Sequence, residues 1–210
     1  MIMKVLAIAA IFACLLVMNS PVSANELFEI TADSTMDGNA GYHLTITEQG
    51  GGITFFVFND SGMIRFYAWR INGLTDWIIV SGSQYVCPAN SMTIGQTWRS
   101  LDDEGQETVA EVIGQENVTT NAGTFACYRV DVEHVSNPGT SLGEMWFSSG
   151  VGIVTQQDHF PDEWQSDLWD YGIVGGSGFF PLAVGNFWEY QDIISPVEAT
   201  TWGAIKSKYN

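Results

Sequence analysis

The fold is decided by residues 179–190, Phe-Phe-Pro-Leu-Ala-Val-Gly-Asn-Phe-Trp-Glu-Tyr. Their pattern is repeated in residues 85–98, Tyr-Val-Cys-Pro-Ala-Asn-Ser-Met-Thr-Ile-Gly-Gln-Thr-Trp. Each copy has an aromatic residue, then Pro, then an apolar residue before a Gly, and then a Trp three residues after that Gly. Proline suits the approach to a strand, glycine permits a bend, and tryptophan buries a large ring against a sheet. Turn-forming Pro and Gly residues that recur before an aromatic strand predict a β domain.

Strand-like segments separated by turn residues continue on both sides of these motifs. Residues 42–48 alternate between apolar and polar side chains, residues 53–71 read as a hairpin around an Asn-Asp-Ser-Gly turn, and residues 124–134 alternate most clearly. Only residues 163–168 are compatible with a short helix. The sequence predicts an all-β fold, an antiparallel meander of about ten strands forming an open barrel or sandwich, with at most short helices.

The first 24 residues have the order of a secretory signal peptide: a basic start, an apolar run over residues 5–18, and small residues before Ala24. The run is shorter than the ~20 residues needed to span a bilayer. Cys14 raises the alternative of a lipoprotein, but Phe12 is bulky where a small residue is expected. We therefore expect cleavage after Ala24 and an exported protein, located in the periplasm, at the cell surface or outside the cell.

Composition and length limit the possible partners and the number of domains of the exported chain, residues 25–210. It keeps all 24 acidic residues and 6 of the 7 basic ones, a net charge of −18, so a nucleic-acid backbone is excluded as partner. Solubility is the simplest interpretation of this charge, with Ca²⁺ or a cationic partner as the alternatives. The length predicts a single β domain, in which residues 179–210 are either a closing segment or a truncated repeat.

Two cysteines, Cys87 and Cys127, follow the signal peptide. An even number of cysteines in an oxidising compartment predicts one disulfide, which would close a loop of about 40 residues and contribute roughly 4 kcal/mol in the chain-entropy model. The alternative is a pair of buried thiols.

The chain resembles a known group of exported bacterial proteins in three places. Residues 112–130 read V-I-G-Q-E-N-V-T-T-N-A-G-T-F-A-C-Y-R-V, residues 146–154 read W-F-S-S-G-V-G-I-V, and residues 180–190 carry F-P-L-A-V-G-N-F-W-E-Y. These segments resemble domain-of-unknown-function proteins with the patterns FPLxxGNxWxY and AGTF followed by WxxxGVGxV. The resemblance implies a periplasmic or cell-surface β domain and no established activity.

One departure from that group concerns the order of the motifs. FPLxxGNxWxY usually opens the domain in the group, whereas here about 20 residues follow Tyr190. The motif therefore supplies a closing strand or begins a second repeat that is cut short.

Residues typical of catalysis are sparse and scattered. The three histidines, at positions 43, 134 and 159, have no nucleophile or ligand at a recognised spacing, and no nucleophile elbow, phosphate-binding loop or zinc-protease motif occurs. We predict no catalytic residue, no metal site and no cofactor, and therefore no enzyme. Hydrolysis would instead require two carboxylates facing each other across a cleft, at roughly 5–9 Å.

The densest polar and aromatic cluster lies in residues 158–171. It could bind Ca²⁺ through carboxylates or a sugar through stacked rings, although the D-x-D-x-D-G spacing of a calcium loop is missing. The simplest interpretation is a solvated loop whose aromatic residues cover the core. The candidate ligand surface comprises Asp158, Asp162, Glu163, Trp164 and Trp169.

Three functions are compatible with these observations. The first is a non-catalytic envelope β protein with a structural or interaction role, whose partner, a protein, a glycan or a lipid, is unknown. The second is a periplasmic carrier of a lipid or acyl chain, which would need an apolar cavity of several hundred Å³. The third is a carbohydrate-binding module. A filled interior would bury the aromatic residues of 53–71 against each other, at Phe55, Phe56, Phe58, Tyr67 and Trp69.

Overall fold

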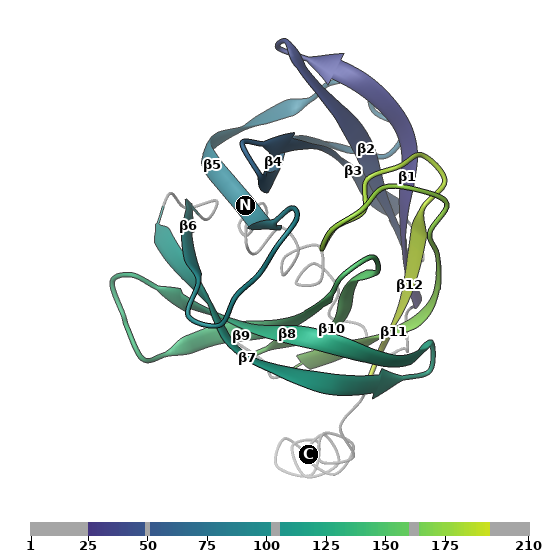
Figure 1. Ribbon diagram of the computed structural model, residues 1–210. Helices are drawn as coiled ribbons and strands as arrows, with labels where there is room; N and C mark the ends of the chain where they lie inside the picture. The colour runs from purple at the N-terminus through teal and green to yellow at the C-terminus, as the bar shows by residue number, and fades with distance from the viewer. Residues whose placement is uncertain (1–24, 49–50, 102–105, 160–163, 194–210) are drawn as a thin grey trace, which may run out of the picture.

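The computed structural model describes residues 25–48, 51–101, 106–159 and 164–193 (Figure 1), so the predicted signal peptide lies outside the described residues. The described residues form twelve β-strands and no helix. The strands are β1 (Asn25–Met36), β2 (Asn39–Glu48), β3 (Gly51–Asp60), β4 (Met63–Ile71), β5 (Ile78–Pro88), β6 (Thr97–Leu101), β7 (Glu107–Thr120), β8 (Gly123–His134), β9 (Ser141–Ser148), β10 (Gly152–Asp158), β11 (Trp164–Gly172) and β12 (Phe187–Asp192).

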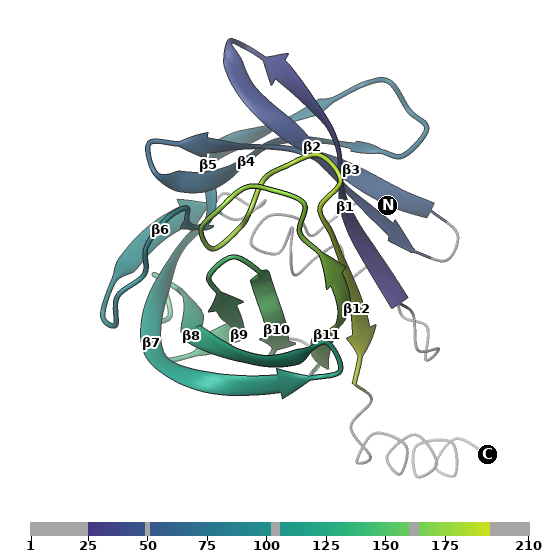
Figure 2. The same ribbon diagram turned by 45° about the vertical axis from the view of Figure 1, so that its right-hand side comes forward.

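All twelve strands belong to one antiparallel sheet, in the order β5-β4-β3-β2-β1-β12-β11-β10-β9-β8-β7-β6. The sheet curls until its end strands, β5 and β6, meet at the left of Figures 1 and 2. No ladder joins β5 to β6 within the described ranges, so the sheet is not closed into a barrel. The all-β meander predicted from the sequence is confirmed, with twelve strands where about ten were expected.

Two local expectations need correction. The short helix considered at residues 163–168 is not formed over its described part, because Trp164–Gly172 is a strand that pairs with both β10 and β12. Ladder bonds on both sides outweigh the weak helical pattern of so short a segment. The first strand, Asn25–Met36, is absent from the strands expected from sequence, because short polar residues dilute its alternation.

The hairpin expected around residues 59–62 is present. Ser61 and Gly62 have φ of 54° and 91°, and the Asn59 side-chain oxygen accepts the Gly62 N–H at 2.8 Å. This left-handed pair turns β3 into β4, as the turn residues predict.

The main core fills the concave side of the curled sheet with large apolar side chains. Trp188 packs against Phe180 with a ring separation of 5.6 Å, and Phe55 stacks on Phe66 at 5.0 Å. A smaller outer cluster lies apart from this core and centres on Phe56, Phe58 and Ala68, with Met36, Tyr67 and Trp77 packed against it. The aromatic residues of 53–71 are therefore divided between two clusters instead of packing together.

Asn186 in the second motif organises the loop between β11 and β12. It is fully buried, and its side-chain oxygen accepts the N–H groups of Val174 and Gly175 at 2.8 and 3.3 Å. Its side-chain nitrogen donates to the carbonyls of Gly175 and Pro181 at 2.9 and 2.7 Å. One side chain thereby holds the loop, residues 173–186, in a single shape.

The same loop joins the two repeated motifs across one end of the curled sheet (Figure 2). The Phe179 N–H donates to the Ala89 carbonyl at 3.0 Å, and the Gly150 N–H donates to the Gly178 carbonyl at 2.7 Å. Gly178 has φ of +85° and lies so close to Ala89 that a Cβ atom would overlap its carbonyl oxygen. The motif therefore has a structural role in both copies, because its Pro and Gly residues shape the turns that lead into strands.

Cys87 and Cys127 are free thiols, so the predicted disulfide between them is not formed. Cys87 lies near the end of β5, paired with Ile64 of β4, whereas Cys127 lies on β8 between the neighbouring strands β7 and β9. Each side chain is buried among its own neighbours, so the alternative of two buried thiols describes the structure.

We expect both thiols to resist alkylation in the native protein. Burial raises the pKa of Cys127 to about 11 and raises that of Cys87 further. At pH 8 only roughly 0.1% of Cys127 is therefore thiolate, the reactive form. Iodoacetamide at pH 8 followed by mass spectrometry should label neither cysteine in native protein and both in guanidinium chloride. A mass two daltons below that of the dithiol, with no labelling after unfolding, would instead reveal the disulfide.

Candidate functional site

The cluster predicted at residues 158–171 does not form one surface within the described residues. Asp158 is buried at the end of β10, whereas Trp169 lies at a bulge in β11 with 42% of its surface exposed. Asp162 and Glu163 lie outside the described residues, as does the side chain of Trp164. Binding of Ca²⁺ or a sugar by this segment stays a prediction.

The histidines are dispersed. His43 lies on β2 with its Nε2 at 2.9 Å from the Ser34 hydroxyl and its ring 5.2 Å from that of Trp77. Burial, followed by the nearby charge of Arg70, lowers the pKa of His43, so its neutral form prevails near neutral pH. Within the described part of the chain, no three His, Cys, Asp or Glu residues are placed to hold a metal ion.

A charged cluster holds the long β7–β8 hairpin against β9. The Arg129 guanidinium donates to both carboxylate oxygens of Glu144, at 2.6 and 2.7 Å, and lies 5.3 Å from the Trp146 ring centre. The Trp146 indole N–H donates to the Glu116 carboxylate at 2.7 Å. Each of these four side chains is held by a hydrogen bond to another member of the cluster, which favours a structural role for the cluster.

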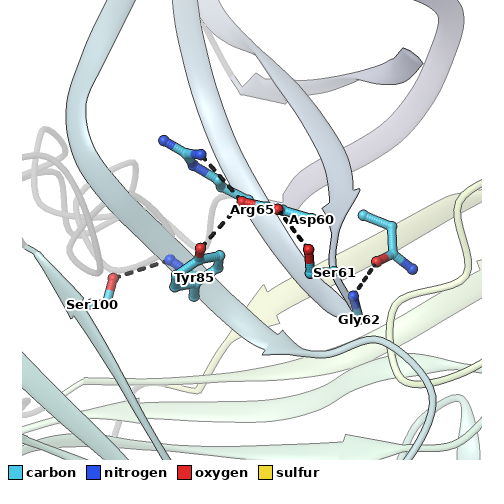
Figure 3. Close-up of polar contacts among 7 residues, drawn as sticks. Asp60, Ser61, Gly62, Arg65, Tyr85 and Ser100 are labelled. Atoms are coloured by element: carbon cyan, nitrogen blue, oxygen red, sulfur yellow. Dashed lines mark hydrogen bonds and ion pairs between the residues drawn. The ribbon is translucent and has the colours of Figure 1, made fainter. Parts of the chain in front are cut away.

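A second polar cluster surrounds Asp60 at the end of β3 (Figure 3). Its carboxylate accepts from the Arg65 guanidinium at 3.2 Å and from the Tyr85 hydroxyl at 3.2 Å. The backbone N–H of Tyr85 in turn donates to the Ser100 hydroxyl on β6 at 3.1 Å. This cluster therefore reaches the junction between the two ends of the sheet.

The outer cluster on β3 and β4 was not expected from the sequence. The Tyr67 hydroxyl donates to Asp37 at the β1–β2 turn, and the Arg70 guanidinium lies 4.5 Å from the Trp77 ring centre. The only sequence signal was the unbroken apolar run Phe55 to Phe58, since a strand covered on both faces loses its alternation.

A small cavity lies within the main core. It lies between β1, β2, β10 and β12, and its volume of about 10 Å³ is far below the volume of an acyl chain. Next to it Gln156 is 1% exposed, and burial raises the pKa of Tyr190, with Glu26 adding to the shift. The cavity is lined by Phe28, Leu44, Ile153, Gln156, Phe180, Trp188 and Tyr190.

Exposed apolar side chains gather on the connection from β4 to β5. Four large aliphatic residues within nine positions expose between 45% and 57% of their surface, namely Ile71, Leu74, Ile78 and Ile79. We call them the 71–79 segment. Single exposed aliphatic residues are ordinary, whereas a group of them indicates an interaction surface.

The comparisons with known proteins add a family for part of the chain. Residues 88–160 match the profile of a family described as DUF3108-like, a family of domains of unknown function. Searches of curated proteins and of solved structures gave no significant match. Within the residues described, no helix has the length and apolar character needed to cross a membrane.

Proposed function

We propose that the protein is a non-catalytic β module exported to the bacterial envelope, where it has a structural or interaction role. Two features support a role in binding over catalysis. The side chains in the polar clusters around Asp60 and Arg129 form hydrogen bonds and ion pairs that hold hairpins in place. The cavity of about 10 Å³ between β1, β2, β10 and β12 is too small for a lipid substrate or cargo. Export rests on the order of segments in residues 1–24.

The 71–79 segment is the observation on which the interaction role depends. Ile78 and Ile79 begin β5, where they pair with Trp69 and Ala68 of β4 on one side. The opposite edge of β5 has no ladder partner among the described residues. An apolar strand edge with unpaired backbone groups can add a strand from another protein, and natural proteins usually protect such edges with charges or proline. The partner that fits is an apolar strand of a second envelope protein.

Photo-cross-linking in the producing cell tests this role. With p-benzoylphenylalanine at position 74, we expect one discrete conjugate of higher mass, because Leu74 is 57% exposed within the segment. Position 94 is the matched control, since Ile94 is 64% exposed but stands alone in a loop. Conjugation at neither position, or the same conjugates from both, would contradict the proposal.

Native mass spectrometry of protein purified from its own compartment separates the interaction role from the carrier alternative. We expect the bare polypeptide mass, because an interaction module carries no lipid cargo and the cavity between β1, β2, β10 and β12, about 10 Å³, cannot hold an acyl chain. A retained lipid lost on delipidation would overturn the interaction role in favour of the carrier.

A further inference from the structure

The two repeated motifs enter the sheet through the same hydrogen bonds. In the first copy, the Gly95 N–H donates to the Val112 carbonyl at 2.8 Å and the Val112 N–H donates to the Gln96 carbonyl at 2.9 Å. The second copy repeats both bonds at 2.8 Å, with Gly185, Ile30 and Asn186 in the corresponding places. Both glycines have left-handed backbone, with φ of +82° and +94°.

The equivalence extends across the sheet. Following paired residues from strand to strand gives one row through Ile30, Leu44, Phe55 and Trp69, and a matching row through Val112, Val130, Met145 and Gln156.

Irregularities in the strands also recur at corresponding places. A bulge follows Ile30 in the β1–β2 ladder, and a bulge follows Val112 in the β7–β8 ladder. The β3–β4 and β9–β10 ladders each have an extra residue, Tyr67 and Val154, next to the same rows. Because bulges insert at specific positions, these two matched pairs support the equivalence of the two halves.

These matches divide the sheet into two six-stranded units. One runs continuously through β6 to β11, and the other is assembled from β12 followed by β1 to β5. The family match at residues 88–160 falls within the continuous unit and the loop before it. The FPLxxGNxWxY motif, residues 180–190, thus leads into and includes the first strand of its unit, even though it lies late in the chain.

The two junctions between the units should be alike, but they differ. β11 and β12 are joined by six residue pairs, from Ser166↔Asp192 to Gly172↔Phe187. At the other junction, the bond from the Tyr85 N–H to the Ser100 hydroxyl links β5 to β6 without a ladder among the described residues. We call this junction the β5–β6 seam.

The tryptophans of the motifs show the same difference. The Trp188 indole N–H donates to the Val151 carbonyl, whereas the Trp98 indole N–H is buried without a hydrogen-bond partner among the described residues. Trp98 is only 8% exposed and lies at the seam on β6. A buried donor without an acceptor destabilises the folded state, because it has lost its hydrogen bonds to water.

We propose that the sheet opens at the β5–β6 seam, giving lateral access to the core around Trp98. Opening there breaks no backbone ladder among the described residues, whereas opening at the β11–β12 junction would break a full ladder. Local opening occurs where the fewest backbone hydrogen bonds must be lost. This inference concerns the β5 edge at Tyr85, whereas the partner proposed for the 71–79 segment would pair with the same edge at Ile78 and Ile79.

Hydrogen exchange on the full chain tests the proposal, with the β11–β12 junction as internal control. We expect amides in residues 97–101 to exchange at least about tenfold faster than those in residues 187–192. Ser100→Ala should accelerate exchange in residues 97–101 further and leave residues 187–192 unchanged. Tyr85→Phe is the matched control, because the Tyr85 hydroxyl bonds to Asp60 and does not cross the seam.

Two results would overturn the proposal. One is equal protection at both junctions of the unmodified protein. The other is a Ser100→Ala variant whose exchange rises equally at both junctions, which would indicate general destabilisation. A loss of protection in Tyr85→Phe as large as that in Ser100→Ala would likewise count against the seam bond.

Discussion

Asn186→Ala lowers the free energy of unfolding by about 2–4 kcal/mol, because it removes four hydrogen bonds from a fully buried side chain. The variant leaves the Gly175 and Pro181 carbonyls without their donor and empties the space that the amide fills. Urea denaturation measures the loss directly. For a chain of this length, the melting temperature should fall by about 5–15 °C.

The internal equivalence supplies a matched control for this variant. Gln96 occupies the place of Asn186 in the first motif, but its side chain makes one bond near the surface, accepting the Thr93 N–H at 3.1 Å. Gln96→Ala should therefore cost less than about 1 kcal/mol. Equal losses in the two variants would show that Asn186 contributes only its backbone conformation and not its buried amide.

A conservative variant separates hydrogen bonding from volume. Asn186→Asp keeps an oxygen that can accept from Val174 and Gly175 but loses both donated bonds and buries a charge. It should be at least as destabilising as Asn186→Ala near neutral pH. Its stability should recover as the pH falls, because burial raises the pKa of a carboxyl group and protonation removes the charge.

Local patterning was sufficient to predict the fold class and several turns. The hairpin at residues 59–62 and the all-β meander follow from alternation and turn chemistry, which act over a few residues. The two motifs were recognised as copies, but their shared hydrogen bonds to Ile30 and Val112 depend on pairing with residues distant in sequence. A single sequence does not specify such pairing.

The candidate site was less predictable for a related reason. Asp158 and Trp169 are near in sequence, but they differ in burial because a bulge in β11 turns Trp169 outward. Ile71, Leu74 and Ile79 are exposed on and beside the connection from β4 to β5, and an apolar pattern alone does not reveal which apolar residues stay exposed.

The largest loss of stability is expected for Gly178→Ala, about 3–6 kcal/mol, because two penalties combine at one position. The residue has φ of +85°, and its new Cβ would overlap the Ala89 carbonyl oxygen, a backbone atom that cannot rotate away. Relief requires the loop over residues 173–186 to move from the first motif, which breaks the bond from the Phe179 N–H to Ala89. Urea denaturation of purified protein, or loss of soluble protein on expression, reports the effect.

Gly95→Ala isolates the backbone term, since Gly95 has φ of +82° but no atom within 4 Å of the position of a new Cβ. It should cost only about 1 kcal/mol, the strain of an alanine in left-handed backbone. The difference between the two variants is therefore the contribution of close contact between the motifs. If Gly178→Ala were as mild as Gly95→Ala, the loop would not be held against Ala89, and the two motifs would fold as independent turns.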